Sequence, residues 1–437
     1  MKLKFFFFCS LLFIFGCEGW YGERANKPLP GKRAPILGIQ DNLQVNPKLA
    51  NLPFKLPAPE KNKRWPQNFN TNKQSIQHLQ TRADLKPLWE TDIGEGSDDE
   101  AQLIASPVVV NNQIFTIDAE AKISALDVKT GQVLWQKTLA PPEEDYGTMG
   151  GGLGYAFGVL YVTTGFAEVI ALNAKNGDLI WKTKVNSPIR AAPTIFKNYL
   201  FAVSISNELY AFDIKRGKLL WNHLGIAESA NLLGGAAPTI GGSVVIVSYS
   251  SGELIALQIE NGRIIWTNSI RATRRLDPLS SLAHIRGQPI VDRGFVILTA
   301  NSGRTMAIDL RTGEQIWEIQ VGSGNDPWVA GDNVFITSNN NELLCISRKT
   351  GGIRWKTQLP KFKDEKDKEG PIFWSGPVLA GKRLLVGGSN KQVLSISPFT
   401  GQILNHIKGS GPIFIRPIVA DGIVYILSDN AKLLALH

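Results

Sequence analysis

Short apolar runs recur through residues 88–437 and alternate with turns that contain glycine, asparagine or aspartate. In the first unit, residues 106–110 and 114–117 flank an Asn-Asn-Gln turn, residues 123–126 form a third apolar run, and residues 133–135 form a fourth. Runs of this length with a turn about every eight to twelve residues predict β-strands. A helix is hard to place anywhere in this region. The pattern therefore predicts an all-β fold.

The same unit is repeated along the chain: a small and an apolar residue in the third run, then a turn glycine, then a tryptophan. Ala125, Gly131 and Trp135 show it first, and successive turn glycines are 38 to 51 residues apart. A repeat of about 40 to 50 residues made of short strands is typical of a β-propeller. Tryptophan suits the wide outer rim of a wedge-shaped blade. We expect the following residues to pack between blades: Trp89, Trp135, Trp181, Trp221, Trp266, Trp317 and Trp355.

Eight copies of the third run predict an eight-bladed propeller whose blades each have four antiparallel strands. The eighth copy lacks a fourth strand, because the chain ends at His437. An unpaired run at residues 88–90 precedes the first copy, and Trp89 lies 46 positions before Trp135. We therefore expect this N-terminal run to supply the outer strand of the eighth blade, which closes the ring and removes exposed sheet edges.

Residues 1–16 have the pattern of a secretory signal peptide. Two lysines precede an apolar run at residues 5–15 that is too short to span a bilayer. The run ends in a glycine followed by Cys17, which resembles the bacterial lipobox and implies that Cys17 becomes a lipid-modified, N-acylated mature N-terminus. Glu18 then favours sorting to the outer membrane. An ordinary cleaved signal followed by a chance cysteine is the alternative.

A basic, proline-rich segment follows the leader. Residues 17–60 predict a flexible tether, residues 61–87 an N-terminal extension that packs on the propeller, and residues 88–437 the propeller itself. The net charge of +9 divides into +2 for residues 1–16, +7 for residues 17–87 and 0 for the propeller, where 33 basic side chains balance 33 acidic ones. A nucleic-acid-binding protein usually carries its positive charge on the folded face that docks. The charge distribution therefore excludes nucleic acid as a partner, and the basic tail is either a soluble tether or is attracted to anionic lipid.

Cysteine and histidine are too sparse for the usual metal and redox sites. With Cys9 removed in the leader and Cys17 lipidated, only Cys345 remains in the fold. Its apolar strand predicts a buried, inert thiol. The five histidines are scattered and no paired-cysteine motif is present, so the sequence predicts no metal site.

The repeat Ala-Leu-Asp-x-x-Thr-Gly-x-x-x-Trp at residues 125–135, with its counterpart at residues 307–317, resembles the propeller repeat of pyrroloquinoline-quinone (PQQ) proteins. One class with this repeat comprises periplasmic PQQ-dependent dehydrogenases, which resemble one another in an adjacent Cys-Cys pair, a calcium ion and an aspartate base. With only Cys345 in the mature fold, the Cys-Cys pair cannot form. We therefore expect no catalytic residues and no cofactor, and PQQ-dependent oxidation stays as an alternative.

The other class is the BamB family, lipoproteins of the outer-membrane β-barrel assembly (BAM) complex. The signal, the lipobox and the eight repeats resemble that family, and the segments at residues 33–37, 65–67 and 93–96 look like its α-proteobacterial members. The resemblance implies a non-catalytic scaffold, lipid-anchored at the periplasmic face of the outer membrane. Its implied partners are the periplasmic domain of BamA, other BAM subunits and unfolded outer-membrane protein clients.

The resemblance also implies a partner surface on two adjacent connections between blades, at residues 222–236 and 267–288. The family pattern there is apolar residues with an arginine, then acidic residues one connection later. This chain has Leu232 and Leu233 in the first connection, and His284 and Arg286 where the family has acids. With Arg275, these residues form the candidate partner site: Leu232, Leu233, Arg275, His284 and Arg286. Packing under a loop, or a solvated loop, is the alternative for each.

A third function class is a periplasmic lipoprotein that binds another ligand, such as a glycan. Trp328 and Trp374 lie outside the regular outer-strand positions. An exposed aromatic ring can stack on a sugar, whereas structural burial of both rings is the alternative.

Overall fold

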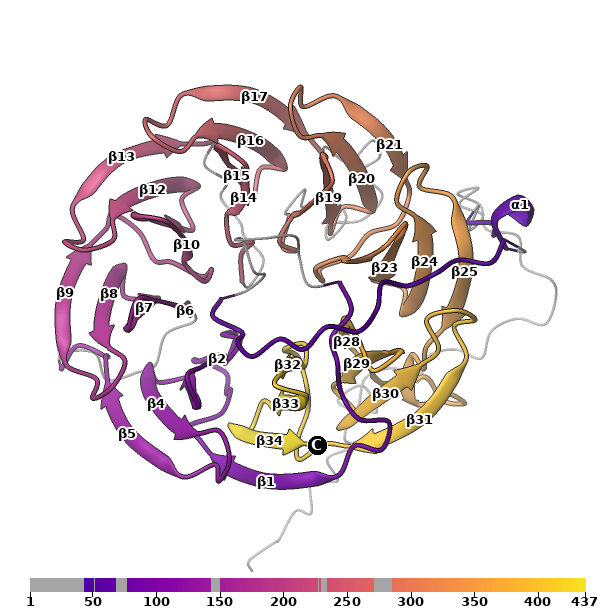
Figure 1. Cartoon of the computed structure of the whole chain (residues 1–437), viewed down its shortest axis with the longest axis horizontal. Helices are drawn as coiled ribbons and strands as arrows, with labels where there is room; N and C mark the ends of the chain where they lie inside the picture. Colours follow the sequence, from indigo (N-terminus) through magenta and orange to yellow (C-terminus); the bar gives the residue numbers. More distant parts are fainter. Residues whose placement is uncertain are drawn as a thin grey trace, which may run out of the picture. The chain divides into compact units, whose positions relative to one another are not determined.

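Each repeat of the sequence folds into one four-stranded antiparallel blade, and eight blades follow one another around a ring (Figure 1). The computed structural model describes residues 43–50, 52–67, 77–142, 150–226, 228, 234–270 and 285–437, and residues 43–437 form one compact unit. The predicted eight-bladed propeller, closed by an N-terminal outer strand, is confirmed.

Within each blade the strands run in sequence order from the channel to the rim, except that the eighth blade takes its outer strand from the N-terminal side. From the inner to the outer strand, the blades are β2 (Val108–Val110), β3 (Gln113–Ile117), β4 (Lys122–Asp127) and β5 (Val133–Thr138); β6 (Gly151–Ala156), β7 (Val159–Thr164), β8 (Glu168–Asn173) and β9 (Leu179–Lys184); β10 (Thr194–Phe196), β11 (Tyr199–Val203), β12 (Glu208–Asp213) and β13 (Leu219–Leu224); β14 (Thr239–Gly241), β15 (Val244–Ser248), β16 (Glu253–Gln258) and β17 (Ile264–Ser269); β18 (Ile290–Asp292), β19 (Phe295–Ala300), β20 (Arg304–Asp309) and β21 (Gln315–Ile319); β22 (Trp328–Ala330), β23 (Asn333–Thr337), β24 (Glu342–Ser347) and β25 (Ile353–Gln358); β28 (Trp374–Ala380), β29 (Arg383–Gly388), β30 (Gln392–Ile396) and β31 (Ile403–Lys408); β32 (Ile418–Ala420), β33 (Ile423–Leu427), β34 (Lys432–Leu436) and β1 (Pro87–Asp92).

The small residue of the third strand has a structural reason. Ala125 is paired across the sheet with Trp135, Ala307 with Trp317, and Cys345 with Trp355. Cys345 takes the place of the alanine and is fully buried. Burial raises the pKa of its thiol, so the thiol stays protonated at neutral pH. A small side chain beside a large one keeps the two outer strands close while the indole fills the rim.

Each outer-strand indole also reaches the next blade. Its Nε1–H donates to a backbone carbonyl one or two residues after the third strand of that blade, at 2.7 to 3.1 Å. A buried indole N–H needs such an acceptor, and here the bond joins two blades. The seven pairs are Trp89 with Val128, Trp135 with Ala174, Trp181 with Ile214, Trp221 with Ile259, Trp266 with Leu310, Trp317 with Arg348, and Trp355 with Pro398.

The junction between the seventh and eighth blades differs in composition from the others. The outer strand of the seventh blade carries Asn405 in place of tryptophan, paired with Ser395.

The ends of the ring are joined by β1 and β34, which run antiparallel with Trp89 opposite Ala435. Two side chains of β1 then contact the first blade: Trp89 Nε1 lies 3.0 Å from the carbonyl oxygen of Val128, and Thr91 Oγ1 lies 2.7 Å from that of Gly131. The N-terminal strand thus closes the sheet of the eighth blade and joins it to the first.

The described residues before β1 lie against the propeller. They include the short helix α1 (Pro47–Ala50). The backbone N–H of Asn46 donates to the carbonyl of Ile353 at 2.8 Å, and Leu43 packs on a hydrophobic cluster that includes β23 and β24. Contact with the propeller thus begins inside the segment 17–60, for which we expected a flexible tether.

The connection between β25 and β28 contains a charge-mixed run at residues 364–369. It forms a two-stranded hairpin, β26 (Phe362–Asp364) and β27 (Glu369–Pro371), whose side chains are largely exposed. Among the described residues, no helix is long and apolar enough to cross a membrane.

Candidate functional site

The two faces of the ring differ in what covers them. One face carries the connections from each outer strand to the next inner strand, together with the turns between second and third strands. These elements touch: Ile205 N–H donates to the carbonyl of Pro188 at 2.8 Å, and Asp429 N–H to that of Pro412 at 2.7 Å. We call this the connection face. The other, the turn face, carries the remaining turns.

The N-terminal extension crosses the centre of the ring on the turn face (Figure 1). Trp65 forms an antiparallel bridge with Val109 of the first blade, and the carbonyl of Pro66 accepts from the N–H of Tyr155 in the second. On the other side of the ring, Asn62 and Leu79 bond the inner strands of the eighth and seventh blades. The extension therefore covers the channel on the turn face.

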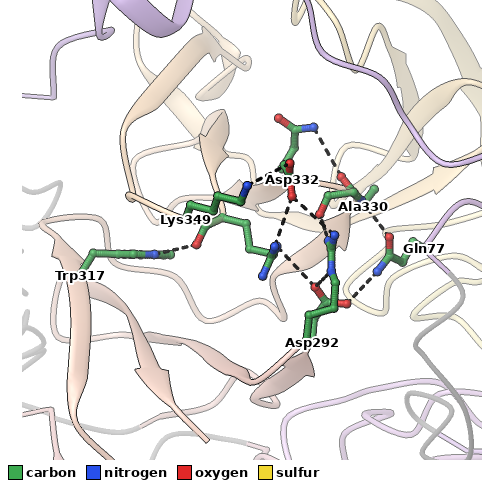
Figure 2. Close-up of polar contacts among 10 residues, drawn as sticks. Gln77, Asp292, Trp317, Ala330, Asp332 and Lys349 are labelled. Carbon is green, nitrogen blue, oxygen red and sulfur yellow. Dashed lines mark hydrogen bonds and ion pairs between the residues drawn. The ribbon is translucent and has the colours of Figure 1, made fainter.

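Figure 2 shows one anchor of the extension, a polar cluster between the fifth and sixth blades. Gln77 Nε2 donates to the Asp292 carboxylate at 2.7 Å, and Gln77 Oε1 accepts from the N–H of Gly331 at 2.8 Å. Arg348 lies 3.5 Å from Asp292 and 3.2 Å from Asp332. The Arg348 and Asp292 side chains are only 5% and 4% exposed. This buried ion pair joins two blades and the extension.

Asp332 is the more accessible acid of that cluster. Partial burial raises the pKa of its carboxyl, but the Arg348 hydrogen bond together with Lys349 and Arg293 outweighs burial and holds the pKa below its ordinary value. Asp332 is therefore ionised at neutral pH. The charged groups of this cluster face one another (Figure 2), which is the geometry of a structural ion-pair network.

The centre of the connection face is hollow. A cavity of about 130 Å³ is lined by residues from all eight blades, each at or just before an inner strand. Three arginines from different blades, Arg190, Arg286 and Arg416, line it together with one acid, Asp326. The charged side chains that line the cavity in the described part of the chain therefore sum to about +2.

The arginines differ in their surroundings. Arg416 Nη1 lies 3.0 Å from Asp326 Oδ2, and its guanidinium lies 5.7 Å from the ring centre of Trp65. Arg286 is exposed to the cavity. The surrounding protein lowers the pKa of both arginines, and Asp326 opposes the effect. An arginine pKa lowered in this way means that the protein around the guanidinium replaces water without fully compensating its charge.

Of the predicted partner residues, Arg286 is described and lies on the connection face, in this cavity. Its neighbour there is Gly234 of the adjacent connection, where a Cβ atom would stand 3.2 Å from Arg286 Nε. Leu232, Leu233, Arg275, His284 and the lipidation candidate Cys17 lie outside the described residues. The structure therefore brings together the two connections on which the candidate partner site was predicted.

The structure buries both tryptophans considered for glycan stacking. Trp328 and Trp374 donate their Nε1–H groups to the carbonyls of Gln77 and Pro360, each at 2.9 Å, and their rings are buried. Neither can stack on a sugar. Among the described residues of the connection face, the exposed aromatic rings are those of Phe373 and Phe414, whose centroids are 6.3 Å apart.

Sequence reasoning missed Arg190, Asp326 and Arg416. The signal that could have found them is positional, because each stands two to four residues before an inner strand: β10, β22 and β32. In a propeller this position faces the channel. Among the residues that the structure describes, no group of three or more histidine, cysteine or acidic side chains could hold a metal ion.

Comparisons with known proteins identify relatives that match most of the chain. The family model described as "Outer membrane protein assembly factor BamB" matches residues 62–149 and 119–357. An outer membrane protein assembly factor BamB of Salmonella typhimurium is 26% identical over 354 residues, which cover 80% of this chain and 88% of that protein. An uncharacterised protein of Rickettsia prowazekii is 28% identical over 279 residues, covering 63% of this chain and 66% of its own length. The Rickettsia relatives support the α-proteobacterial type.

Solved structures share the fold. BamB from Moraxella catarrhalis aligns with a TM-score of 0.69 and 18% identity, covering 81% of this chain and all of that one. A quinohemoprotein alcohol dehydrogenase from Comamonas testosteroni aligns with a TM-score of 0.64 and 13% identity, covering 86% and 80%. At such low sequence identities, the structural similarity establishes the fold alone. The function has to be argued from the residues of this chain.

Proposed function

Because the chain belongs to the family of the outer membrane protein assembly factor BamB, we propose that it is a non-catalytic scaffold lipoprotein of the BAM complex. It binds the periplasmic domain of BamA and assists the folding and insertion of outer-membrane protein clients. Cys17 carries the lipid anchor, and the propeller lies at the periplasmic face of the outer membrane. The observation that carries the proposal is the family match across most of the propeller, supported by the BamB relative in Salmonella.

The connection face is the proposed BamA surface. Arg286 lies against Gly234, so the connections at residues 222–236 and 267–288 meet there. The turn face is less suited, because the N-terminal extension already covers its centre. The proposed contact residues are Leu232, Leu233, Arg275, His284 and Arg286. Arginine is enriched in interface hot spots, and the buried core of an interface is more apolar than the surrounding surface.

The decisive experiment is affinity purification of the full chain after extraction of the membranes in a mild detergent. We expect BamA to co-purify with the wild-type chain, and the paired substitution Leu232→Asp with Leu233→Asp to lower its recovery about tenfold or more. Phe157→Ala is the matched control, because Phe157 is 80% exposed in a turn on the turn face. If the wild-type chain brings down no BamA, the scaffold proposal is wrong.

The likeness to quinoprotein dehydrogenases raises the alternative of PQQ chemistry. An adjacent cysteine pair is ruled out in residues 43–437, because Cys345 is the only cysteine there. The described cavity wall carries three arginines and a single acid, a set that does not suit calcium, which takes six to eight oxygen ligands. These residues do not fit a PQQ–calcium site, and no reaction is derived from one. Quinone absorbance in the purified protein would overturn this assignment.

A further inference from the structure

The cavity on the connection face has an unusual charge balance for the centre of a neutral propeller. Residues 88–437 have no net charge by count, yet the charged side chains that line the cavity in the described part of the chain are three arginines and Asp326. Arg190, Arg286 and Arg416 come from the third, fifth and eighth blades. The ring brings these three positive groups together at one point.

The cavity wall also leaves room for a ligand beside these groups. Glycines line it at Gly151, Gly234, Gly324 and Gly376. Gly234 and Gly324 flank the Arg286 side chain, and a Cβ atom added to them would lie 3.2 and 3.7 Å from it. Wall positions without side chains leave backbone atoms and the guanidinium open to the cavity.

We propose that this cavity binds a small divalent oxyanion of the phosphate type, held by Arg286 together with Arg190 and Arg416. The cavity shares Arg286 with the proposed BamA surface, but its test uses the purified chain without BamA, so the two proposals can fail separately. Asp326 holds Arg416 in place across 3.0 Å, and the described lining has one acid against three arginines, a balance that suits an anion.

Guanidinium groups suit this ligand for geometric reasons. Arginine presents planar pairs of N–H donors that match two oxygens of a phosphate group. The Arg416 side chain is only 8% exposed, so protein has replaced most of the water around it, and an anion there gains more from the charge than it would in solvent. Trp65 lies under Arg416 and, with the extension that crosses the ring, covers the opposite end (Figure 1).

The test is isothermal titration calorimetry of the purified full chain with inorganic phosphate, at constant ionic strength set by sodium chloride. We expect saturable binding that Arg286→Met weakens about tenfold or more, since a charge-assisted contact is lost. Asp326→Asn should strengthen binding severalfold, because it removes the competing negative charge yet keeps an acceptor for the N–H of Gln288. A substitution that only damaged the fold would weaken phosphate binding. Weaker binding in Arg286→Met together with stronger binding in Asp326→Asn therefore indicates a binding site and not a structural effect.

Arg311→Met is the control, because Arg311 is exposed in a turn of the turn face and lies outside the cavity. It should leave phosphate affinity unchanged. The proposal is overturned if the wild-type chain shows no saturable heat, or if Arg286→Met and Arg311→Met bind phosphate alike.

A second arm separates a free phosphate from a lipid phosphate. Sedimentation with vesicles of phosphatidylcholine containing phosphatidic acid is measured with and without inorganic phosphate, for wild type and Arg286→Met. Vesicle binding that phosphate competes away and that Arg286→Met loses assigns the site to a lipid headgroup. Calorimetric binding without such competition assigns it to free phosphate.

Discussion

The indole ring of Trp181 lies directly over Gly217 of the neighbouring blade: a Cβ atom on Gly217 would stand 2.4 Å from a ring carbon. Gly217 also has a φ of +64°, a backbone conformation that residues other than glycine rarely adopt. The same pairing recurs around the ring, for example between Trp355 and Gly401. The glycine of the repeat is therefore required twice, by the turn and by the indole of the previous blade.

This pairing predicts that Gly217→Ala destabilises the propeller more than its turn conformation alone requires. Gly158 is the control, because it has a φ of +82° but no atom within 4 Å of its Cβ position. We expect Gly158→Ala to lower the free energy of unfolding by about 1 to 2 kcal/mol, and Gly217→Ala by about 2 to 5 kcal/mol, since overpacking adds to strain. Urea unfolding followed by tryptophan fluorescence measures both. Equal losses would contradict the role of the indole.

Ring closure through β1 predicts a large effect of Trp89. Trp89→Ala removes the packing on the eighth blade and the bond to Val128, and we expect it to lower the free energy of unfolding by about 2 to 4 kcal/mol. Leu88→Ala is the neighbouring control, because Leu88 is 49% exposed, and should cost less than about 1 kcal/mol. A chain that begins at residue 100 should melt well below the full chain. Closure would be refuted if both melted at one temperature.

The buried Arg348–Asp292 pair predicts that removing one partner lowers the free energy of unfolding more than replacing both. Asp292→Ala removes the buried carboxylate that faces the Arg348 guanidinium and the acceptor of Gln77 Nε2. We therefore expect a loss of about 3 to 5 kcal/mol in the free energy of unfolding. The double substitution Asp292→Leu with Arg348→Met should recover much of that loss, because no charge then remains buried. Asp84→Ala, which breaks a pair exposed on both sides, should change stability by less than about 1 kcal/mol. Chemical denaturation of the wild type and these three variants measures the free energies of unfolding that test the prediction.

His78 predicts a loss of stability in mild acid. Burial lowers its pKa, against a hydrogen bond to the carbonyl of Pro57, and its Nε2 accepts from the N–H of Lys382 at 3.0 Å. The unfolded chain, with a histidine pKa of about 6.5, therefore takes up the proton first as the pH falls. The free energy of unfolding should decrease as the pH falls below about 6.5 and level off below the folded pKa.

His78→Gln should reduce that slope between pH 7 and pH 5, measured by urea unfolding at each pH. His223 contributes in the same direction, because burial also lowers its pKa, so the double variant with His223→Gln should lose more of the slope. An unchanged slope in His78→Gln would rule out this role for His78.

Most of the fold could be predicted because each blade is a local unit. The alternation of residues 123–126, the turn glycine at Gly131 and the indole at Trp135 all act within one repeat or on the next one. The outer strand of the seventh blade departs from this repeat, since Asn405 stands there in place of tryptophan. The hairpin at β26 and β27 was missed because its charged residues carry no apolar alternation.

The candidate site was predicted less well. Arg286 was predicted as a partner contact through a family resemblance; the structure places it in the cavity, and its partner role stays a prediction. Arg190 and Arg416 were missed because nothing local marks them: they meet only where inner strands from distant repeats converge on the channel.

By itself, the sequence determined the number of blades, the strand that closes the ring and the residues that join neighbouring blades, because these depend on a short repeated pattern and on contacts between adjacent repeats. Only the tertiary structure decided that Gln77 and His78 anchor an extension across the turn face, and that three arginines share one cavity with Asp326. The physical reason is that these contacts join positions far apart in the chain, whose distances are set by the closed ring.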